Sequence, residues 1–213
     1  MINLPLNKKK FLSSSYPGVT EYLAKKFSKS GSETMLLYNE KFSVSPVTTH
    51  IKIVDISKKL SKKKIANNFN NIYNFYSKIL DIKKPKIAIL GLNPHNGMDF
   101  SSKTEEQKII VPIINYLNKK FKVKIEGPLS PDTSFVVREI KKINCLIGLY
   151  HDQILTTFKY ICKFSAINIT LGLPFVRMSP DHGTATDIIG KNKADPKSFL
   201  YCLNFFEKFH KTI

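Results

Sequence analysis

The stretch CLIGLYHDQ, residues 145–153, joins an apolar run directly to three polar side chains. A short, wholly apolar run of this kind is typical of a strand that is buried on both faces of a parallel sheet. The same pattern recurs in KIAILGLNPHNG, residues 86–97, where the apolar run ends in a turn-rich loop. In open α/β sheets, ligands bind at the carboxyl ends of such strands. The two stretches therefore predict a parallel sheet with candidate ligand residues along one edge.

Apolar and amphipathic segments alternate along the rest of the chain, which predicts an α/β fold. Helices are expected over residues 18–28, over 54–80 as one or two helices, over 104–119 and over 196–210. Thr104 and Gln107 have the spacing of a capping box. Further strands are expected at residues 2–6, 35–38, 42–47, 167–173 and 175–178, and a loop at 128–132.

The composition favours a protein with a sizeable core and without a membrane span. Of the 213 residues, 42% are hydrophobic, but no apolar run approaches the roughly 20 residues that a bilayer requires. The N-terminal charges follow a very short apolar stretch, which is the reverse of a signal peptide. Cys145, Cys162 and Cys202 form an odd set without metal-ligand spacing, which suits a reducing compartment. We therefore expect a cytoplasmic location and no membrane partner.

The formal net charge of +18 raises the question of nucleic-acid binding, because clustered cations gain affinity by releasing counterions from phosphates. Only Arg138 and Arg177 among the 34 basic residues are arginines, although arginine is best suited to bidentate phosphate or base contacts. The lysines are spread along the chain. We therefore interpret them as solvated surface residues and expect no nucleic-acid partner.

Five side chains are candidates for a ligand site. His50 and His151 each follow the end of an expected strand, so their neutral imidazoles are candidate metal ligands, although spacing alone equally allows structural histidines. Lys159, Asn168 and Arg177 are spaced so that each can come from a different element facing one pocket. The planar fork of Arg177 suits a phosphate or carboxylate. A surface salt bridge is the alternative.

The loop DHGTATDIIG, residues 181–190, is the most informative local stretch. Gly183 allows backbone amides to approach a ligand, and Thr184 and Thr186 offer hydroxyl groups. Asp187 is suited to accept from a ribose hydroxyl or to cap the following turn. A capped loop before a helix is the alternative. Neither a GxGxxG nor a GxxxxGK[ST] pattern occurs in the sequence, so neither a Rossmann nor a P-loop phosphate site is indicated.

Several of these stretches resemble 4-hydroxythreonine-4-phosphate dehydrogenases in order and spacing. They are GLNPHNG (91–97), GPLSPDT (127–133), LYHDQ (149–153) and NITLGLPFVRMSPDHGTATDIIGKNKADPKSF (168–199), with LPLNKKK (4–10), YPGVTEYLA (16–24) and VTTHIKIVDI (47–56) before them. The resemblance implies the α/β/α sandwich of the isocitrate and isopropylmalate dehydrogenase superfamily. Residues 1–165 would form a complete central domain with dimerisation and metal-site elements. Residues 166–213 would be the C-terminal part of an NAD-binding first domain that is only partly present.

The same resemblance implies a function. It is the NAD-dependent oxidation of 4-phosphooxy-L-threonine, a phosphorylated amino acid, to 2-amino-3-oxo-4-phosphooxybutanoate, which decarboxylates to 3-amino-2-oxopropyl phosphate in pyridoxal 5′-phosphate biosynthesis. A divalent metal cation (Zn, Mg, Mn or Co) would polarise the reacting oxygen, and a homodimer would share its active sites. The family's N-terminal portion, with a Gly-Asp-Pro-x-Gly-type motif, is not matched by this sequence. The alternative is therefore a non-catalytic paralogue, or a subunit of a split enzyme that needs a partner chain.

Individual roles follow from the resemblance. The implied metal ligands are His50 and His151, the implied substrate contacts are Lys159, Asn168 and Arg177, and the implied cofactor contacts are His182, Gly183, Thr184, Asp187, Asn192 and Asp195. Lys8 and Asp132 match catalytic positions near the site. The family has a histidine where this chain has Val19, and the resemblance implies that this position belongs to a further metal ligand.

Overall fold

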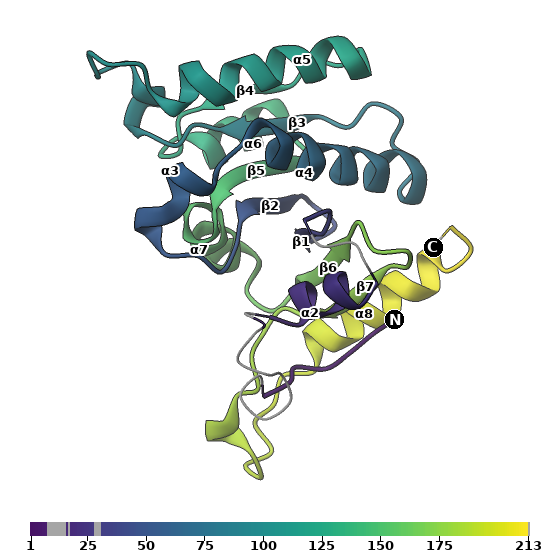
Figure 1. Ribbon diagram of the computed structural model, residues 1–213. Coiled ribbons are helices and arrows are strands. Elements are labelled where there is room, and N and C mark those ends of the chain that lie inside the picture. The colour runs from purple at the N-terminus through teal and green to yellow at the C-terminus, as the bar shows by residue number, and fades with distance from the viewer. Residues whose placement is uncertain (8–15, 17, 28–30, 213) are drawn as a thin grey trace.

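A mixed sheet forms the centre of the molecule (Figure 1). In the residues that the computed structural model describes, 1–7, 16, 18–27 and 31–212, seven strands follow the order β4-β3-β5-β2-β1-β6-β7. Their bounds are β1 Thr34–Tyr38, β2 Ser43–Thr48, β3 Ile87–Leu90, β4 Glu126–Leu129, β5 Cys145–Tyr150, β6 Ile167–Leu171 and β7 Arg177–Pro180. The prediction of an α/β fold is confirmed.

The direction of the strands brings several loops to one edge of the sheet. β2, β5, β3 and β4 are mutually parallel, and β1 runs antiparallel to both β2 and β6. β3 is buried throughout and β5 nearly so, as predicted from their apolar runs. The carboxyl ends of β2, β5 and β3 therefore lie together, and the loops that follow them share an edge.

Helices cover both faces of the sheet and create an α/β/α sandwich (Figure 1). One core cluster joins α4 (Lys62–Asn74), α5 (Val111–Phe121) and α8 (Lys197–Phe209) to the sheet, and a second cluster joins α7 (His151–Cys162) to the opposite face. Leu36 belongs to the first cluster and its neighbour Leu37 to the second. This alternation follows from the pleat, which turns successive side chains to opposite faces.

The remaining helices are shorter. They are α2 (Val19–Lys26), α3 (Ile56–Lys59) and α6 (Ser134–Lys141). A π-helical turn, Phe75–Ile79, extends α4, so that two helices and this turn occupy most of the region predicted as helical over 54–80. The predicted helices over 18–28 and 196–210 correspond to α2 and α8. The structure thus confirms these helices within a few residues at their ends.

Several local predictions are wrong. The loop expected at 128–132 is partly β4, and α6 has no counterpart among the predicted helices. β4 is a short edge strand of glutamate, glycine, proline and leucine, so it carries no apolar alternation that sequence patterns detect. The strand expected at 2–6 is reduced, among the described N-terminal residues, to one parallel bridge between Ile2 and Met178. The strand expected at 175–178 begins at Arg177 and continues to Pro180.

The capping box predicted from Thr104 and Gln107 does not form. The helix there opens with a π-turn, Glu106–Ile110, and among the described side chains none caps it. The Glu106 side chain is turned instead toward the loop after β3, where it accepts hydrogen bonds from the Leu92 and Asn93 amides. The carboxylate at the start of this helix thus makes a tertiary contact.

The sheet continues across the domain boundary predicted between residues 165 and 166. β1, on the N-terminal side, pairs with β6 at five successive positions, from Thr34 opposite Leu171 to Tyr38 opposite Ile167. Backbone hydrogen bonds thus connect the two segments directly. The division into domains stays a prediction.

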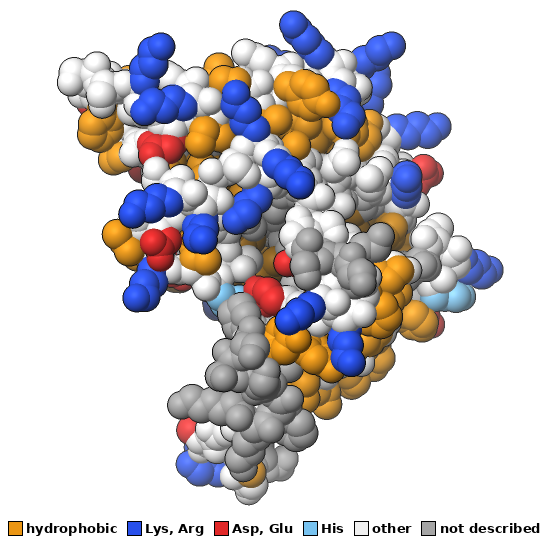
Figure 2. Space-filling view, viewed as in Figure 1, with side chains coloured by type: hydrophobic (Ala, Val, Ile, Leu, Met, Phe, Trp, Pro, Cys, Tyr) orange, Lys and Arg blue, Asp and Glu red, His pale blue; other side chains and the backbone are white. Residues whose placement is uncertain are grey.

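The surface reflects the lysine-rich composition. On the face in Figure 2, lysine side chains are scattered rather than gathered into one patch, and hydrophobic side chains gather over α8. Leu200, Leu203 and Phe206 of α8 are all exposed. Within the described part of the chain, no helix has the length and apolar character needed to cross a membrane.

Gly172 provides a test of the turn between β6 and β7. Its φ is +84°, and a Cβ there would lie 2.1 Å from the Ser32 carbonyl oxygen. We expect Gly172→Ala to lower the free energy of unfolding, measured in urea, by about 2 kcal/mol or more, because strained backbone and a steric clash add. Gly190→Ala is the control, since its φ is +75° but nothing lies within 4 Å of the added atom. Equal losses in both variants would contradict the clash.

Candidate active site

The three predicted substrate contacts line one cavity of ≈ 260 Å³. Lys159 comes from α7, Asn168 from β6 and Arg177 from β7. Asn168 lies opposite Ser179 and Thr170 opposite Arg177 in the antiparallel pair, so these four side chains share a face of the sheet. Ile167, Ile169 and Met178 occupy the other face and join the core. The alternation thus separates a polar cavity wall from the hydrophobic core.

Arg177 is the dominant cation of this cavity. It is 4% exposed, its Nε donates to Asn3 Oδ1 at 2.6 Å, and its Nη1 donates to Thr170 Oγ1 at 3.3 Å. Burial lowers the pKa of Arg177 to about 10, which still leaves the guanidinium charged at neutral pH. A buried, oriented guanidinium is a strong site for a phosphate or carboxylate.

Lys159 and Asp181 form an ion pair beside Arg177, with 3.0 Å between Lys159 Nζ and Asp181 Oδ1. Burial raises the pKa of Asp181, and the neighbouring Lys159 opposes that rise. Asp181 Oδ2 and Asn168 Oδ1 are buried and have no hydrogen-bond partner among the described residues. Since buried oxygen atoms normally accept hydrogen bonds, the cavity suits a ligand that has both an anionic group and donors.

His50 and His151 approach each other at the carboxyl edge of the sheet. Their ring centroids are 6.1 Å apart, and both line a small hollow of ≈ 140 Å³. The Nδ1 atom of His50 lies 2.9 Å from Glu21 Oε1, and that of His151 lies 2.9 Å from Asp152 Oδ1. Burial alone would raise the pKa of Glu21, but the hydrogen bond from His50 and smaller contributions lower it below its usual range.

The two histidines provide only some of the protein ligands that a catalytic metal ion needs. Carboxylates at Nδ1 orient both rings, and no hydrogen bond from another described residue reaches either Nε2, which is the arrangement around metal-binding histidines. Catalytic zinc generally has three protein ligands, and the described residues contain no group of three histidine, cysteine or acidic side chains that could hold a metal ion. Val19 lines the cavity of Arg177 and His50, and is not among the residues that line the hollow at His151. The residues present do not complete a metal site.

Of the two predicted catalytic residues, only Asp132 falls within the described part of the chain, and it does not line this cavity. Lys8 lies outside the described residues. Asp132 is exposed in the loop after β4, where the nearby Ser130 hydroxyl is the main cause of a lowered pKa, and it is absent from the linings of both histidine cavities. His95 follows β3 at the same sheet edge as His50 and His151, with its Nδ1 2.6 Å from Asp99 Oδ2. Sequence reasoning singled out this loop but not His95.

The loop predicted to bind the cofactor forms the wall of a larger cavity of ≈ 660 Å³. Of the predicted cofactor residues, those that line it are His182, Gly183, Thr184, Asn192 and Asp195. Asp187 lies in a short 3₁₀ turn, Thr186–Ile188, and is not part of the lining. Asp195 Oδ1 also accepts from the Lys197 amide at 2.9 Å, at the start of α8.

The two larger cavities adjoin each other. His182 and Gly183 line both the cavity of Arg177 and the cavity of the predicted cofactor loop. One ligand bound at Arg177 and another along the loop would therefore meet at these residues. A wall common to two cavities is the arrangement expected of a site that binds two ligands side by side.

Three contributors to the site were not assigned from the sequence. Asn3 holds Arg177 from a position 174 residues away in the chain, and Thr20 Oγ1 lies 3.3 Å from Thr170 Oγ1. The spacing of residues along the sequence does not predict contacts between positions this far apart in the chain. Asp181 is the first residue of the loop at 181–190, and its position immediately before His182 was the sequence feature that could have indicated its place in the site.

Glu106 anchors the loop that follows β3. It is buried, its Oε1 accepts from the Leu92 and Asn93 amides at 2.7 Å, and its Oε2 accepts from Asn93 Nδ2 at 2.9 Å. Burial alone would raise the pKa of Glu106, but the hydrogen bonds from Asn93 lower it. The ionised carboxylate therefore stabilises the loop that carries His95.

We expect Glu106→Gln to lower the free energy of unfolding at neutral pH by about 1–3 kcal/mol, because a charged acceptor of three N–H groups is lost. Since the folded-state pKa is depressed, this contribution is complete above the ordinary glutamate pKa and is lost as the pH falls through the folded-state pKa. Urea titrations across acidic pH measure it. Glu139→Gln, at an exposed position, is the control. A difference from wild type that does not shrink in acid would contradict this role.

The fold and the joined cavities define a class of protein. An isocitrate dehydrogenase from Methylococcus capsulatus superposes on this chain with a TM-score of 0.60 at 10% sequence identity. The superposition covers 97% of this chain and 67% of that enzyme's chain, and it shows that the two share a fold. A 4-hydroxythreonine-4-phosphate dehydrogenase from Klebsiella pneumoniae superposes on this chain with a TM-score of 0.81 at 32% sequence identity. The superposition covers 100% of this chain and 65% of that enzyme's chain. The architecture is thus of the isocitrate dehydrogenase type.

Sequence comparison gives the family. The model for the pyridoxal phosphate biosynthetic protein PdxA matches residues 1–205. The chain is 43% identical over 202 residues to the 4-hydroxythreonine-4-phosphate dehydrogenase of a Sulfurihydrogenibium species, covering 94% of this chain and 62% of that protein. It is 38% identical to the 4-hydroxythreonine-4-phosphate dehydrogenase of Aquifex aeolicus, and the match covers 97% of this chain and 64% of that protein. The chain belongs to the PdxA family, and it spans somewhat less than two thirds of the length of these relatives.

Proposed function

We propose that this chain serves in the NAD-dependent oxidation of 4-phosphooxy-L-threonine to 2-amino-3-oxo-4-phosphooxybutanoate, which loses carbon dioxide to give 3-amino-2-oxopropyl phosphate. The support comes from membership of the PdxA family and from the wall that the two larger cavities share. That wall is the observation that carries the proposal. It would bring a bound anionic substrate against a nucleotide on the loop.

The side chains of the Arg177 cavity match the groups of such a substrate. Arg177 and Lys159 would bind its phosphate and carboxylate, and the unpartnered oxygens of Asn168 and Asp181 would accept from its ammonium and hydroxyl groups. Asp181 would also keep the Lys159 ammonium oriented toward the substrate through their ion pair. Precise positioning by these groups is itself a large part of catalysis.

The cofactor assignments belong to the same proposal. NAD, when bound, supplies the hydride acceptor, and His182, Gly183, Thr184, Asn192 and Asp195 would contact it along their cavity. His50 and His151 would contribute two ligands to a divalent cation, and its remaining ligands would come from outside this copy of the chain. A second copy of the chain in a homodimer is the proposed source. Sedimentation of the purified protein measures whether the dimer forms.

The test is an assay of NADH formation with 4-phosphooxy-L-threonine, NAD and a divalent cation, together with calorimetric binding of the substrate alone. The proposed function predicts saturable substrate binding and NADH formation. Absence of both would overturn the proposal. Binding without NADH formation would favour the second candidate function below.

The second candidate is a non-catalytic paralogue or a subunit that needs a partner chain. The incomplete set of metal ligands among the described residues favours it. In that case the Arg177 cavity would bind the substrate and the chain alone would not oxidise it. NADH formation by the purified chain would exclude this candidate.

A further inference from the structure

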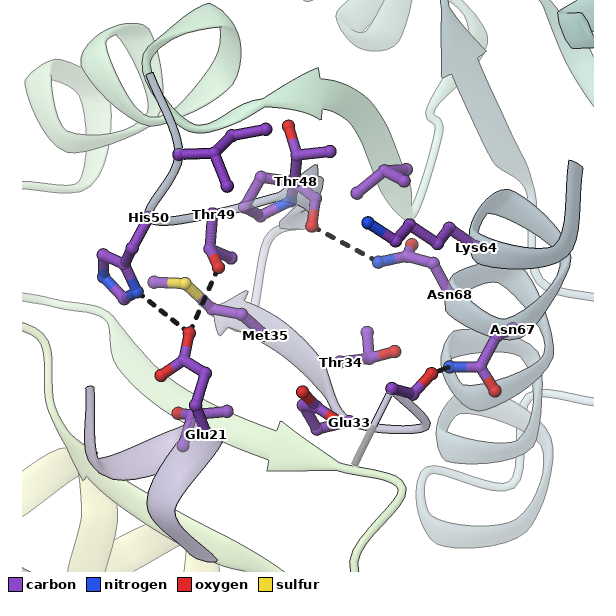
Figure 3. Close-up of a pocket in the computed structure, with 15 residues that line it drawn as sticks. Glu21, Glu33, Thr34, Met35, Thr48, Thr49, His50, Lys64, Asn67 and Asn68 are labelled. Carbon is purple, nitrogen blue, oxygen red and sulfur yellow. Dashed lines mark hydrogen bonds and ion pairs between the residues drawn. The ribbon is translucent and has the colours of Figure 1, made fainter. Parts of the chain in front are cut away.

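A separate cavity of ≈ 160 Å³ lies between α2, the start of β1, the end of β2 and α4 (Figure 3). Thr20, Met35 and His50 are shared with the Arg177 cavity, whereas Glu33, Asn67 and Asn68 line only this one. The volume is well below the roughly 300–1,000 Å³ of pockets for drug-sized ligands. Its occupant would be a small molecule.

Three oxygen atoms around this cavity lack hydrogen-bond donors in the part of the chain that the structure describes. Glu21 Oε2, Glu33 Oε2 and Asn68 Oδ1 are buried and have no partner among the described residues. The other Glu21 oxygen is already used, since Oε1 accepts from Thr49 Oγ1 at 3.3 Å and lies 2.9 Å from His50 Nδ1. A buried acceptor without a donor is costly. The missing donors are what a ligand would provide.

The orientation of the Asn68 amide follows from its neighbours. Asn68 is 4% exposed, and its Nδ2 donates to Ser45 Oγ at 2.9 Å and to the Pro46 carbonyl at 3.4 Å. Ser45 Oγ uses its own proton on the Met35 carbonyl, so it must accept from Asn68. A flipped amide would place the single Asn68 oxygen against two acceptors, Ser45 Oγ and the Pro46 carbonyl oxygen. The unpartnered Oδ1 atom of this cavity-lining residue is therefore required by the network.

The charge of the cavity is opposite to that of the protein. Glu21 and Glu33 make no ion pair with lysine or arginine among the described residues, and Lys64, which also lines the cavity, is exposed on α4. The chain as a whole carries a formal charge of +18, which disfavours non-specific attraction of cations. A cation that binds here must therefore be held by local acceptors.

We propose that this cavity binds a small compound with a protonated primary amine. An ammonium group offers three donors and a positive charge, which matches acceptors drawn from two carboxylates and one amide. Glu33 and Asn68 are the residues that distinguish this site from the Arg177 cavity. The inference is independent of the proposed dehydrogenase function.

The test uses propylammonium as the probe, with 1-propanol as the uncharged compound of similar size. Titration of ¹⁵N-labelled protein is expected to show saturable shifts of the Asn68 side-chain amide with propylammonium and none with 1-propanol. Glu33→Gln is expected to weaken binding by about tenfold or more, because a charge-assisted hydrogen bond is lost. Glu40→Gln removes the same charge at an exposed position near Lys208 and is expected to bind as wild type does.

Three results would overturn the proposal. They are non-saturable shifts, equal binding of 1-propanol, and equal loss of affinity in Glu33→Gln and Glu40→Gln. The shifts of the Asn68 amide in the wild-type protein decide the question even if Glu33→Gln fails to fold.

Discussion

Replacing Arg177 by methionine is expected to weaken the binding of the proposed substrate, 4-phosphooxy-L-threonine, by at least about thirtyfold, because removal of one partner of a buried charged hydrogen-bond pair costs roughly 2–5 kcal/mol. Arg177 is the buried cation of its cavity and is oriented by Asn3 and Thr170. Methionine has a similar length and leaves no guanidinium to meet the anion. Isothermal titration of the substrate into each variant measures the loss.

Two further variants separate charge from geometry. Arg177→Lys keeps the positive charge but loses the planar fork, so its affinity should lie between those of wild type and Arg177→Met. Lys63→Met removes one charge from the exposed face of α4 and should bind as wild type does. Thermal unfolding of all three identifies any loss of fold. A folded Arg177→Met variant with unchanged affinity would remove Arg177 from the substrate site.

Replacing Phe158 by alanine is expected to lower the free energy of unfolding by about 3–5 kcal/mol, a large part of the total for most domains. Phe158 is completely buried between α7 and the sheet, and its ring meets that of Phe42 edge-to-face, with 5.2 Å between centroids. Removal of the ring leaves a cavity beneath the helix that carries both His151 and Lys159. Urea unfolding monitored by circular dichroism measures the change.

Tyr160 supplies the matched control on the same helix. Its side chain is 83% exposed, so Tyr160→Ala should change the unfolding free energy by less than about 0.5 kcal/mol. If both variants lose similar stability, the loss would reflect helix propensity rather than packing on the sheet. The burial assigned to Phe158 would then be wrong.

The sequence predicted most of the fold where apolar residues form a continuous run or recur at helical spacing. The apolar runs at 86–90 and 145–150 are β3 and β5, and the spaced apolar residues within 54–80 and 196–210 are α4 and α8. It failed at two elements that have few buried side chains. β4 has no apolar alternation, and α6 is a helix of eight residues in which only Ser134 is buried.

The residues of the candidate site, like the elements of the fold, were predicted from the sequence only in part. Lys159, Asn168 and Arg177 were chosen as residues of separate elements, and the structure brings them into one cavity. His50 and His151, about a hundred residues apart, lie with ring centroids 6.1 Å apart. Asp132 and Asp187 do not line the cavities that hold the other candidates. A motif indicates which residue types occur, but loop geometry determines where they point.

By itself, the sequence determined the α/β class, the family resemblance and the set of polar side chains at strand ends, because these depend on local periodicity and on ordered motifs. Only the tertiary structure decided which of those side chains meet. Strand register places Asn168 and Arg177 on the polar face, Asn3 orients Arg177 across 174 residues, and Glu33 and Asn68 form an acceptor-lined cavity. The physical reason is that partner, burial and charge environment arise from contacts between distant segments, which no local pattern encodes.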